Sequence, residues 1–101
     1  MTTAEPEMAQ ERLLQQLGDP RSDIRLQAIA TLGSRGNADA AAALVECALR
    51  YPADTIAAVE VIRSLCRLPR GLFRRAALRT LHEQHPEATV RRAAARALAD
   101  G

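Results

Sequence analysis

A stretch of eleven residues occurs three times in this chain, and successive copies start 33 residues apart. The copies read SDIRLQAIATL from Ser22, TIAAVEVIRSL from Thr55 and ATVRRAAARAL from Ala88. Small and aliphatic residues occupy the same places in all three copies, and each copy ends on leucine. A fixed period of this length is typical of a fold made of stacked repeat units.

The copies and the stretches between them follow a helical pattern. Apolar side chains recur three and four positions apart, and runs that alternate apolar with polar residues are missing. Hydrophobic residues make up 48% of the chain but aromatic ones only 2%, so the core has to consist of Ala, Leu, Ile and Val, which suits closely spaced helices. We therefore predict an all-α fold of five to six helices. They are expected at residues 6–17, 22–32 and 38–50, from 54 or 55 to 67, from 70 or 72 to 82, and from 89 (or 85) to 99.

The turns before the three copies share one pattern. Each contains a proline three residues ahead of a short polar residue. Proline stiffens the turn, and the polar side chain can accept the first free N–H groups of the helix. This agreement between turn chemistry and hydrophobic period strengthens the prediction of a repeat. The pairs are Pro20 with Asp23, Pro52 with Thr55, and Pro86 with Thr89.

One apolar stripe per helix is expected to be buried. In the fifth helix this stripe is Phe73, Ala76, Ala77 and Leu81, with Leu72 beside it. The corresponding residues of the second, third and fourth helices are Ile24, Ala28, Ile29, Leu32, Ala41, Leu44, Val45, Ala48, Ala58, Val61, Ile62 and Leu65.

The two cysteines, Cys47 and Cys66, have no CxxC spacing and are expected to be buried free thiols, as in a reducing cytosol. The acidic N-terminal segment lacks the apolar run of a signal peptide. No stretch approaches the roughly 20 apolar residues that a membrane span requires. We therefore expect a cytoplasmic protein without a membrane anchor.

Two of the copies carry a more specific motif. Asp-Ile-Arg-x-x-Ala-x-x-x-Leu-Gly occupies residues 23–33 after Asp19-Pro20, and Thr-Val-Arg-x-x-Ala-x-x-x-Leu occupies 89–98. The middle copy departs from it, with Ala57-Ala58 at the place of the aliphatic residue and the arginine. Over residues 10–99 the chain resembles HEAT-like repeat proteins, and its short period is similar to the units of the phycobilisome lyase group.

The resemblance implies a right-handed α-α superhelix. We expect one domain over residues 6–101, after a disordered segment 1–5, with repeats at about 22–50 and 55–82 and a partial one at 88–99. In such a stack the helices at 38–50 and 70–82 would line the concave face.

Arg25 and Arg91 stand at the recurrent arginine position of the family. The resemblance implies that they form partly exposed ion pairs with acids of nearby turns, such as Asp19, Asp23 or Glu87.

Basic residues gather in the fifth helix. Six arginines and no acid lie between Val61 and His82. On a helical projection Arg75, Arg79 and His82 share one face, which predicts a positive strip suited to an acidic protein partner. A solvated face whose arginine stems cover alanine-rich surface remains an alternative. The candidate partner-binding residues are Arg70, Arg74, Arg75, Arg79 and His82.

Other chemistry finds little support in the sequence. His82, His85 and Cys66 do not have the spacing of a zinc site, and neither a nucleophile elbow nor a phosphate-binding loop is present. We therefore expect a non-catalytic interaction scaffold without metal or cofactor. Three alternatives remain open. The resemblance permits a component of a chromophore lyase. The chain could bind a nucleic-acid backbone, although stacking aromatics are missing and the net charge is only +2, or it could form a homo-oligomer through the apolar faces of its terminal helices.

Overall fold

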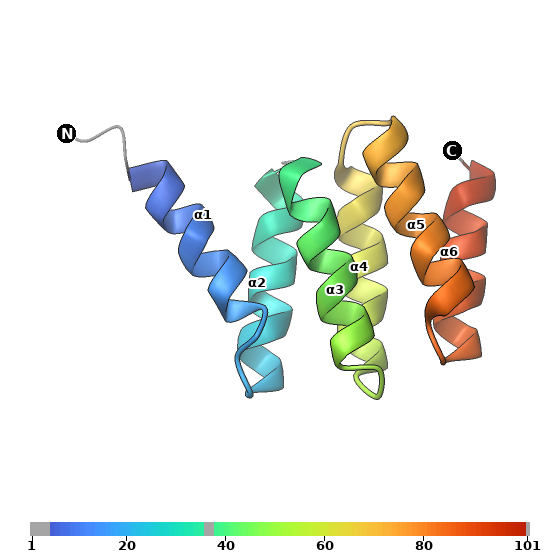
Figure 1. Ribbon diagram of the computed structural model, residues 1–101, viewed down its shortest axis with the longest axis horizontal. Helices are drawn as coiled ribbons and strands as arrows, with labels where there is room; N and C mark the ends of the chain where they lie inside the picture. Colours follow the sequence, from blue (N-terminus) through green and yellow to red (C-terminus); the bar gives the residue numbers. More distant parts are fainter. Residues whose placement is uncertain (1–4, 36–37, 101) are drawn as a thin grey trace.

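The computed structural model describes residues 5–35 and 38–100, and this part of the chain forms six α-helices (Figure 1). A turn of 3-10 helix, η1 (Ala38–Ala40), leads into the third of them. The predicted disordered segment 1–5 lies outside the described residues, except for Glu5, which begins the first helix. The helices are α1 (Glu5–Gln16), α2 (Ser22–Arg35), α3 (Ala41–Arg50), α4 (Thr55–Arg67), α5 (Leu72–Gln84) and α6 (Ala88–Asp100).

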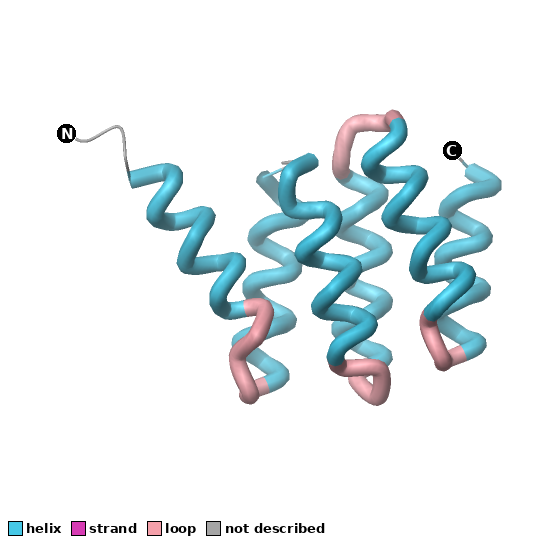
Figure 2. The backbone as a smooth tube through the Cα atoms, in the orientation of Figure 1, coloured by secondary structure: helices cyan, strands magenta, loops and turns pink. Residues whose placement is uncertain are grey.

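The helices lie in two layers. One layer holds α1, α3 and α5, and the other holds α2, α4 and α6 (Figure 1). Within the layers α2 packs on α4, α4 on α6, and α3 on α5. Short turns join α1 to α2, α3 to α4 and α5 to α6 along one edge of the stack (Figure 2). The stack measures 45 × 30 × 15 Å, and the predicted all-α solenoid of paired helices is confirmed.

Local chemistry accounts for the ends of the helices. Asp54 caps α4, because its Oδ1 accepts the backbone N–H of Ala57 at 3.1 Å. Pro69, just after α4, cannot continue a helix. Gly71 precedes α5 with a φ of +155°, which a residue with a side chain adopts only with strain.

The core consists of small and aliphatic side chains, as expected. Helices α2 and α4 pack closely against each other, and the buried hydroxyl of Ser64 donates to the carbonyl of Ile29 at 3.1 Å. A Cβ added to Gly33 would lie 2.9 Å from the Cα of Ser64, so only glycine fits at this point of α2. The largest fully buried apolar residues are Ile29, Leu32, Leu44, Val61, Leu65, Leu78, Leu81 and Val90.

The predicted buried stripe of α5 is wrong in part. Leu72 is 84% exposed and Phe73 73% exposed, and Ala76 is exposed as well. The buried stripe runs through Ala77, Leu78 and Leu81, because this side of α5 meets its neighbours in the stack. The first apolar pair of the helix, Leu72 and Phe73, lies at its exposed start and does not belong to this stripe.

One cysteine also differs from the expectation. Cys47 is buried, and Cys66 is exposed near the end of α4; both are free thiols. In the part of the chain that the structure describes, no helix is both long and apolar enough to cross a bilayer.

Candidate functional site

The basic residues of the fifth helix lie mostly on the surface. Arg70, Arg75, Arg79 and His82 are exposed, and Arg74 is half-buried. Among the described residues none of these four arginines forms an ion pair with a carboxylate. By contrast, Arg63 and Arg67 of α4 do form ion pairs, since both lie within 4.0 Å of the carboxylate of Glu60.

Three of the arginines surround one pocket. Arg70, Arg74 and Arg75 line a hollow of about 380 Å³ between α5 and α6. The Nη1 atom of Arg74 donates to the backbone carbonyl of Leu68 at 3.4 Å, which holds this side chain beside the start of α5. The apolar floor of the pocket is made by Leu78, Ala97 and Leu98.

The other two predicted residues lie outside this pocket. Arg79 is exposed farther along α5. The Nδ1 atom of His82 lies 3.3 Å from the backbone carbonyl oxygen of Arg91, at the α6 side of the helix. The structure therefore brings Arg70, Arg74 and Arg75 together and leaves Arg79 and His82 apart from them.

The groove between α3 and α5 has a different character. It has a volume of about 400 Å³, and Phe73 and Thr80 of α5 line it. None of the five predicted binding residues lines this groove. Its other lining residues are Asp39, Ala41, Ala42, Val45, Ala76 and Ala77. The sequence placed the basic strip on a surface shared with the third helix, whereas the structure places its pocket on the α6 side of α5.

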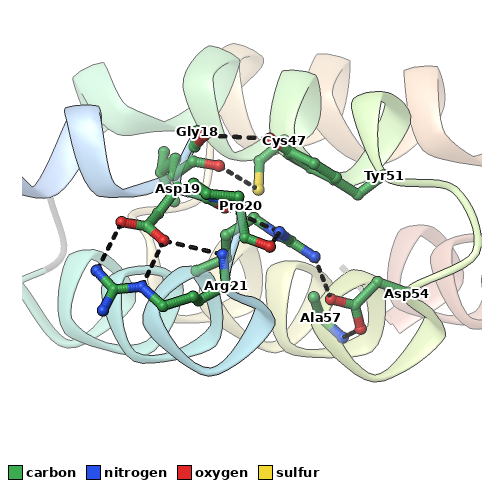
Figure 3. A network of polar contacts seen from close by, with 10 residues as sticks. Gly18, Asp19, Pro20, Arg21, Cys47, Tyr51, Asp54 and Ala57 are labelled. Carbon is green, nitrogen blue, oxygen red and sulfur yellow. Dashed lines mark hydrogen bonds and ion pairs between the residues drawn. The ribbon is translucent and has the colours of Figure 1, made fainter.

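A second polar cluster joins the turn between α1 and α2 to Tyr51 and to Asp54 (Figure 3). Arg25, near the start of α2, makes most of its contacts. Its Nη1 atom donates to the backbone carbonyls of Asp19 at 2.8 Å and of Pro20 at 3.1 Å. Its Nη2 atom donates to Oδ2 of Asp54 at 3.2 Å, and its guanidinium lies 3.8 Å from the ring centre of Tyr51.

This cluster corrects the expected pairing of Arg25. The side chain is buried rather than partly exposed, and its carboxylate partner is Asp54, not Asp19 or Asp23. Asp54 is the N-cap of α4, 29 residues farther along the chain. The arginine therefore ties the first turn to the following helix pair. An acid recurs at this position one period later, as Glu87, but one period earlier the residue is Arg21, so periodicity alone does not identify the partner.

Neighbouring groups close the same turn. Tyr51 donates its hydroxyl to the carbonyl of Gly18 at 3.2 Å, and the thiol of Cys47 donates to the carbonyl of Leu17 at 3.4 Å (Figure 3). Burial raises the pKa of the Cys47 thiol, which keeps it protonated and disfavours a nucleophilic role. Asp19 binds Arg21 through its side chain at 3.0 Å, and this hydrogen bond lowers the pKa of the Asp19 carboxyl.

The turn between α5 and α6 repeats part of this arrangement. The Nη1 atom of Arg91 donates to the carbonyls of His85 at 2.9 Å and of Pro86 at 2.8 Å. The expected ion pair with Glu87 is absent, and no other carboxylate in residues 5–35 and 38–100 binds Arg91.

His85 is buried in this turn. Its Nδ1 atom accepts the backbone N–H of Glu87 at 3.1 Å, and its Nε2 atom is buried without a hydrogen-bond partner. Burial lowers the pKa of His85, with the Ala48 backbone and the Glu87 carboxylate acting in the opposite direction and Arg91 acting with it. The imidazole therefore serves the turn as a neutral acceptor. Within the described residues no group of three or more His, Cys, Asp or Glu side chains is placed to hold a metal ion.

Comparison with known proteins agrees with the repeat fold. A family model described as HEAT repeats matches residues 2–63, which is more than half of the chain. It spans the Arg25 turn and most of α4. Neither the curated proteins nor the solved structures contain a match to the chain.

Proposed function

Because the chain belongs to the HEAT-repeat family, whose members are generally protein-interaction scaffolds, we propose that it is a non-catalytic adaptor that binds an acidic segment of a protein partner. The binding surface is the arginine pocket, defined by Arg70, Arg74 and Arg75, with Arg79 and His82 extending it along α5. The observation that carries this proposal is that four arginines in and just before α5 have no carboxylate partner among the described residues.

The pocket combines two features that an acidic peptide can use. Guanidinium groups bind carboxylates by paired, charge-assisted hydrogen bonds. Leu78 and Leu98 provide an apolar floor between the charges, where an aliphatic side chain of the peptide can bury surface. The arginines set the sign of the partner and raise its association rate, and the apolar floor contributes affinity.

The test uses fluorescence anisotropy with a labelled peptide that alternates Asp or Glu with Leu. The double variant Arg75→Glu and Arg79→Glu should weaken binding at least tenfold, since each charge-assisted contact contributes about 1.5–3 kcal/mol. The matched control is Arg92→Glu plus Arg96→Glu on α6, which changes the net charge equally at exposed residues that do not line the pocket.

The outcomes separate this function from its rivals. Equal affinity in both double variants would show that only net charge matters, and the pocket assignment would be wrong. Tighter binding of an oligonucleotide, with steep salt dependence, would favour a nucleic-acid backbone as ligand. A shift in the absorbance of an added bilin would favour the chromophore-lyase alternative.

A further inference from the structure

The outer edge of α6 resembles the edge of α2 that receives α4, but it has Ala99 in place of Gly33, so a helix on this edge lies farther out than α4 does on α2. The two helices are related by a shift of 66 residues, which places Ala95 at the position of Ile29 and Leu98 at the position of Leu32. Ile29 and Leu32 are completely buried, because α2 packs on α4. Ala95 and Leu98 are only half-buried, so within residues 5–35 and 38–100 this edge of α6 has no helix packed over it as α4 packs over α2.

The hydrogen bonds of Arg91 also match only part of those of its counterpart in α2, Arg25. Arg25 uses Nη1 to hold the two carbonyls of its own turn and Nη2 to hold the N-cap carboxylate of the next helix. Arg91 uses Nη1 on the two corresponding carbonyls. Within the described residues its Nη2 atom has no carboxylate partner, although the first half of the contact is already in place.

We infer that the α6 edge, defined by Arg91, Ala95 and Leu98, docks a helix of a protein partner that begins with an aspartate N-cap. The aspartate binds Arg91 as Asp54 binds Arg25, and the apolar stripe of the partner helix covers Ala95 and Leu98. Alanine stands where α2 has isoleucine, so this edge leaves room for a larger aliphatic side chain of the partner.

A second copy of this chain fits the edge poorly. If copies stacked end to end, the α2 helix of one copy would meet the α6 edge of the other. The residue that corresponds to Asp54 is Arg21, which directly precedes α2 and whose guanidinium binds the side chain of Asp19. At this position a second copy therefore offers Arg91 a cation where the contact requires a carboxylate. The charge at this single position therefore favours a different protein that carries an acid there.

The inference rests on the proposed function, because it specifies the structure of the acidic partner. The partner segment is a helix that lies along α6 and begins at Arg91. The arginine pocket is lined by Leu98 of the same edge, so the far end of such a helix reaches the arginines of α5. A carboxylate at each end of the partner helix would then meet a guanidinium.

The probe is a synthetic peptide with the sequence of residues 51–68, which contains α4 and its Asp54 cap, with Cys66→Ser. It is titrated into the ¹⁵N-labelled chain and followed by NMR. The amide signals of Arg91, Ala95 and Leu98 should shift. A peptide with Asp54→Asn should bind about tenfold more weakly, as expected for loss of a charge-assisted hydrogen bond. Because this change is in the peptide, it leaves the folding of the protein untouched.

Two protein variants complete the experiment. Leu98→Glu, at a half-buried position, should abolish the shifts, while Arg92→Glu on the exposed side of α6 should leave them unchanged. Shifts confined to α2 would mean that the peptide displaces the chain's own α4, and no shifts at millimolar peptide would mean that the edge binds nothing. Dimers that disappear in Leu98→Glu would identify a second copy as the occupant. Each of these three results overturns the inference.

Failure of this inference can be told apart from failure of the proposed function. Loss of acidic-peptide binding in Arg75→Glu plus Arg79→Glu, without any effect of the α4 peptide on α6, removes the helical partner and keeps the arginine pocket. The opposite pattern keeps the α6 edge and removes the pocket.

Discussion

The turn before α2 and the turn before α6 use the same motif but differ in what they connect. In both, an arginine donates from Nη1 to two successive carbonyls of its own turn. Only the first arginine continues to a carboxylate of the next helix pair and lies over an aromatic ring. The motif therefore encodes closure of the turn, and the link between repeats depends on residues outside it.

The largest expected difference between the two turns comes from removing the arginines. Arg25→Met leaves Asp54 and two carbonyls without their partner in a buried setting, and should lower the free energy of unfolding by about 3 kcal/mol. Arg91→Met frees only two carbonyls at a half-exposed turn and should cost about 1 kcal/mol. Urea denaturation of both variants measures the difference. Equal losses would mean that the link to Asp54 contributes nothing.

The second comparison concerns how closely the helices approach. Gly33→Ala places a Cβ against the backbone of Ser64 and should cost about 2 kcal/mol by forcing α2 and α4 apart. Ala99 is exposed at the corresponding place in α6, so Ala99→Gly should show only the helix propensity of glycine, a loss of at most about 1 kcal/mol. Thermal unfolding of both variants is the measurement. If Gly33→Ala left the free energy of unfolding unchanged or raised it, the two helices could move apart at no cost, and the prediction would be wrong.

A smaller effect is expected at Tyr51. Tyr51→Phe removes the hydrogen bond to Gly18 and keeps the ring beside Arg25, so the free energy of unfolding should fall by about 1 kcal/mol or less. Tyr51→Leu also removes the ring and should cost about 0.5–1 kcal/mol more. Gln84, the corresponding residue before the last turn, is exposed, and Gln84→Ala in the same urea series should have no measurable effect. A loss at Gln84 as large as that at Tyr51 would contradict the proposed difference between the turns.

The smallest effect is a dependence on pH. The folded pKa of His85 lies below its ordinary value of 6.5, so the unfolded chain binds more protons in this range. The stabilising contribution is therefore complete above about pH 6.5 and is lost as the pH falls toward the folded pKa. The same sign applies to Asp19, but its window begins below its ordinary value of 3.8. The two turns should thus weaken at different pH.

Urea midpoints between pH 7 and 4 test this prediction. His85→Asn keeps an acceptor for the N–H of Glu87 and removes the titrating group, so it should flatten the upper part of the profile. An unchanged slope would assign that part to another residue.

Much of the fold could be predicted from the sequence, because the buried stripe of a helix appears as apolar residues three and four positions apart. The stripes of α2, α3 and α4 follow the predicted residues closely. In α5 the sequence LFRRAALRTL offers two overlapping apolar stripes, and only the position of the neighbouring helices decides that Leu78 is buried and Phe73 exposed. Periodicity gives the stripe of a helix but not the direction in which its neighbours lie.

The candidate site was predictable only as a local cluster. The excess of arginine in and just before α5 is visible in the sequence, and four arginines of this segment lack acidic partners in the described part of the chain. That Arg70, Arg74 and Arg75 share a pocket with Leu98 depends on the packing of α5 against α6. Likewise, the partner of Arg25 is a residue of the next repeat, which no spacing within the motif specifies.

The 15 Å thickness of the two-layered stack has a consequence for how the protein opens. Among the described residues, the main contacts run between neighbouring helices of one layer and across the two layers. Stacks of this kind lose order from their ends inward, one unit at a time. Amide hydrogen exchange should therefore be slowest in the α2–α4 contact and progressively faster toward α1 and α6. A partner bound at an end of the stack would slow the local unfolding of that end.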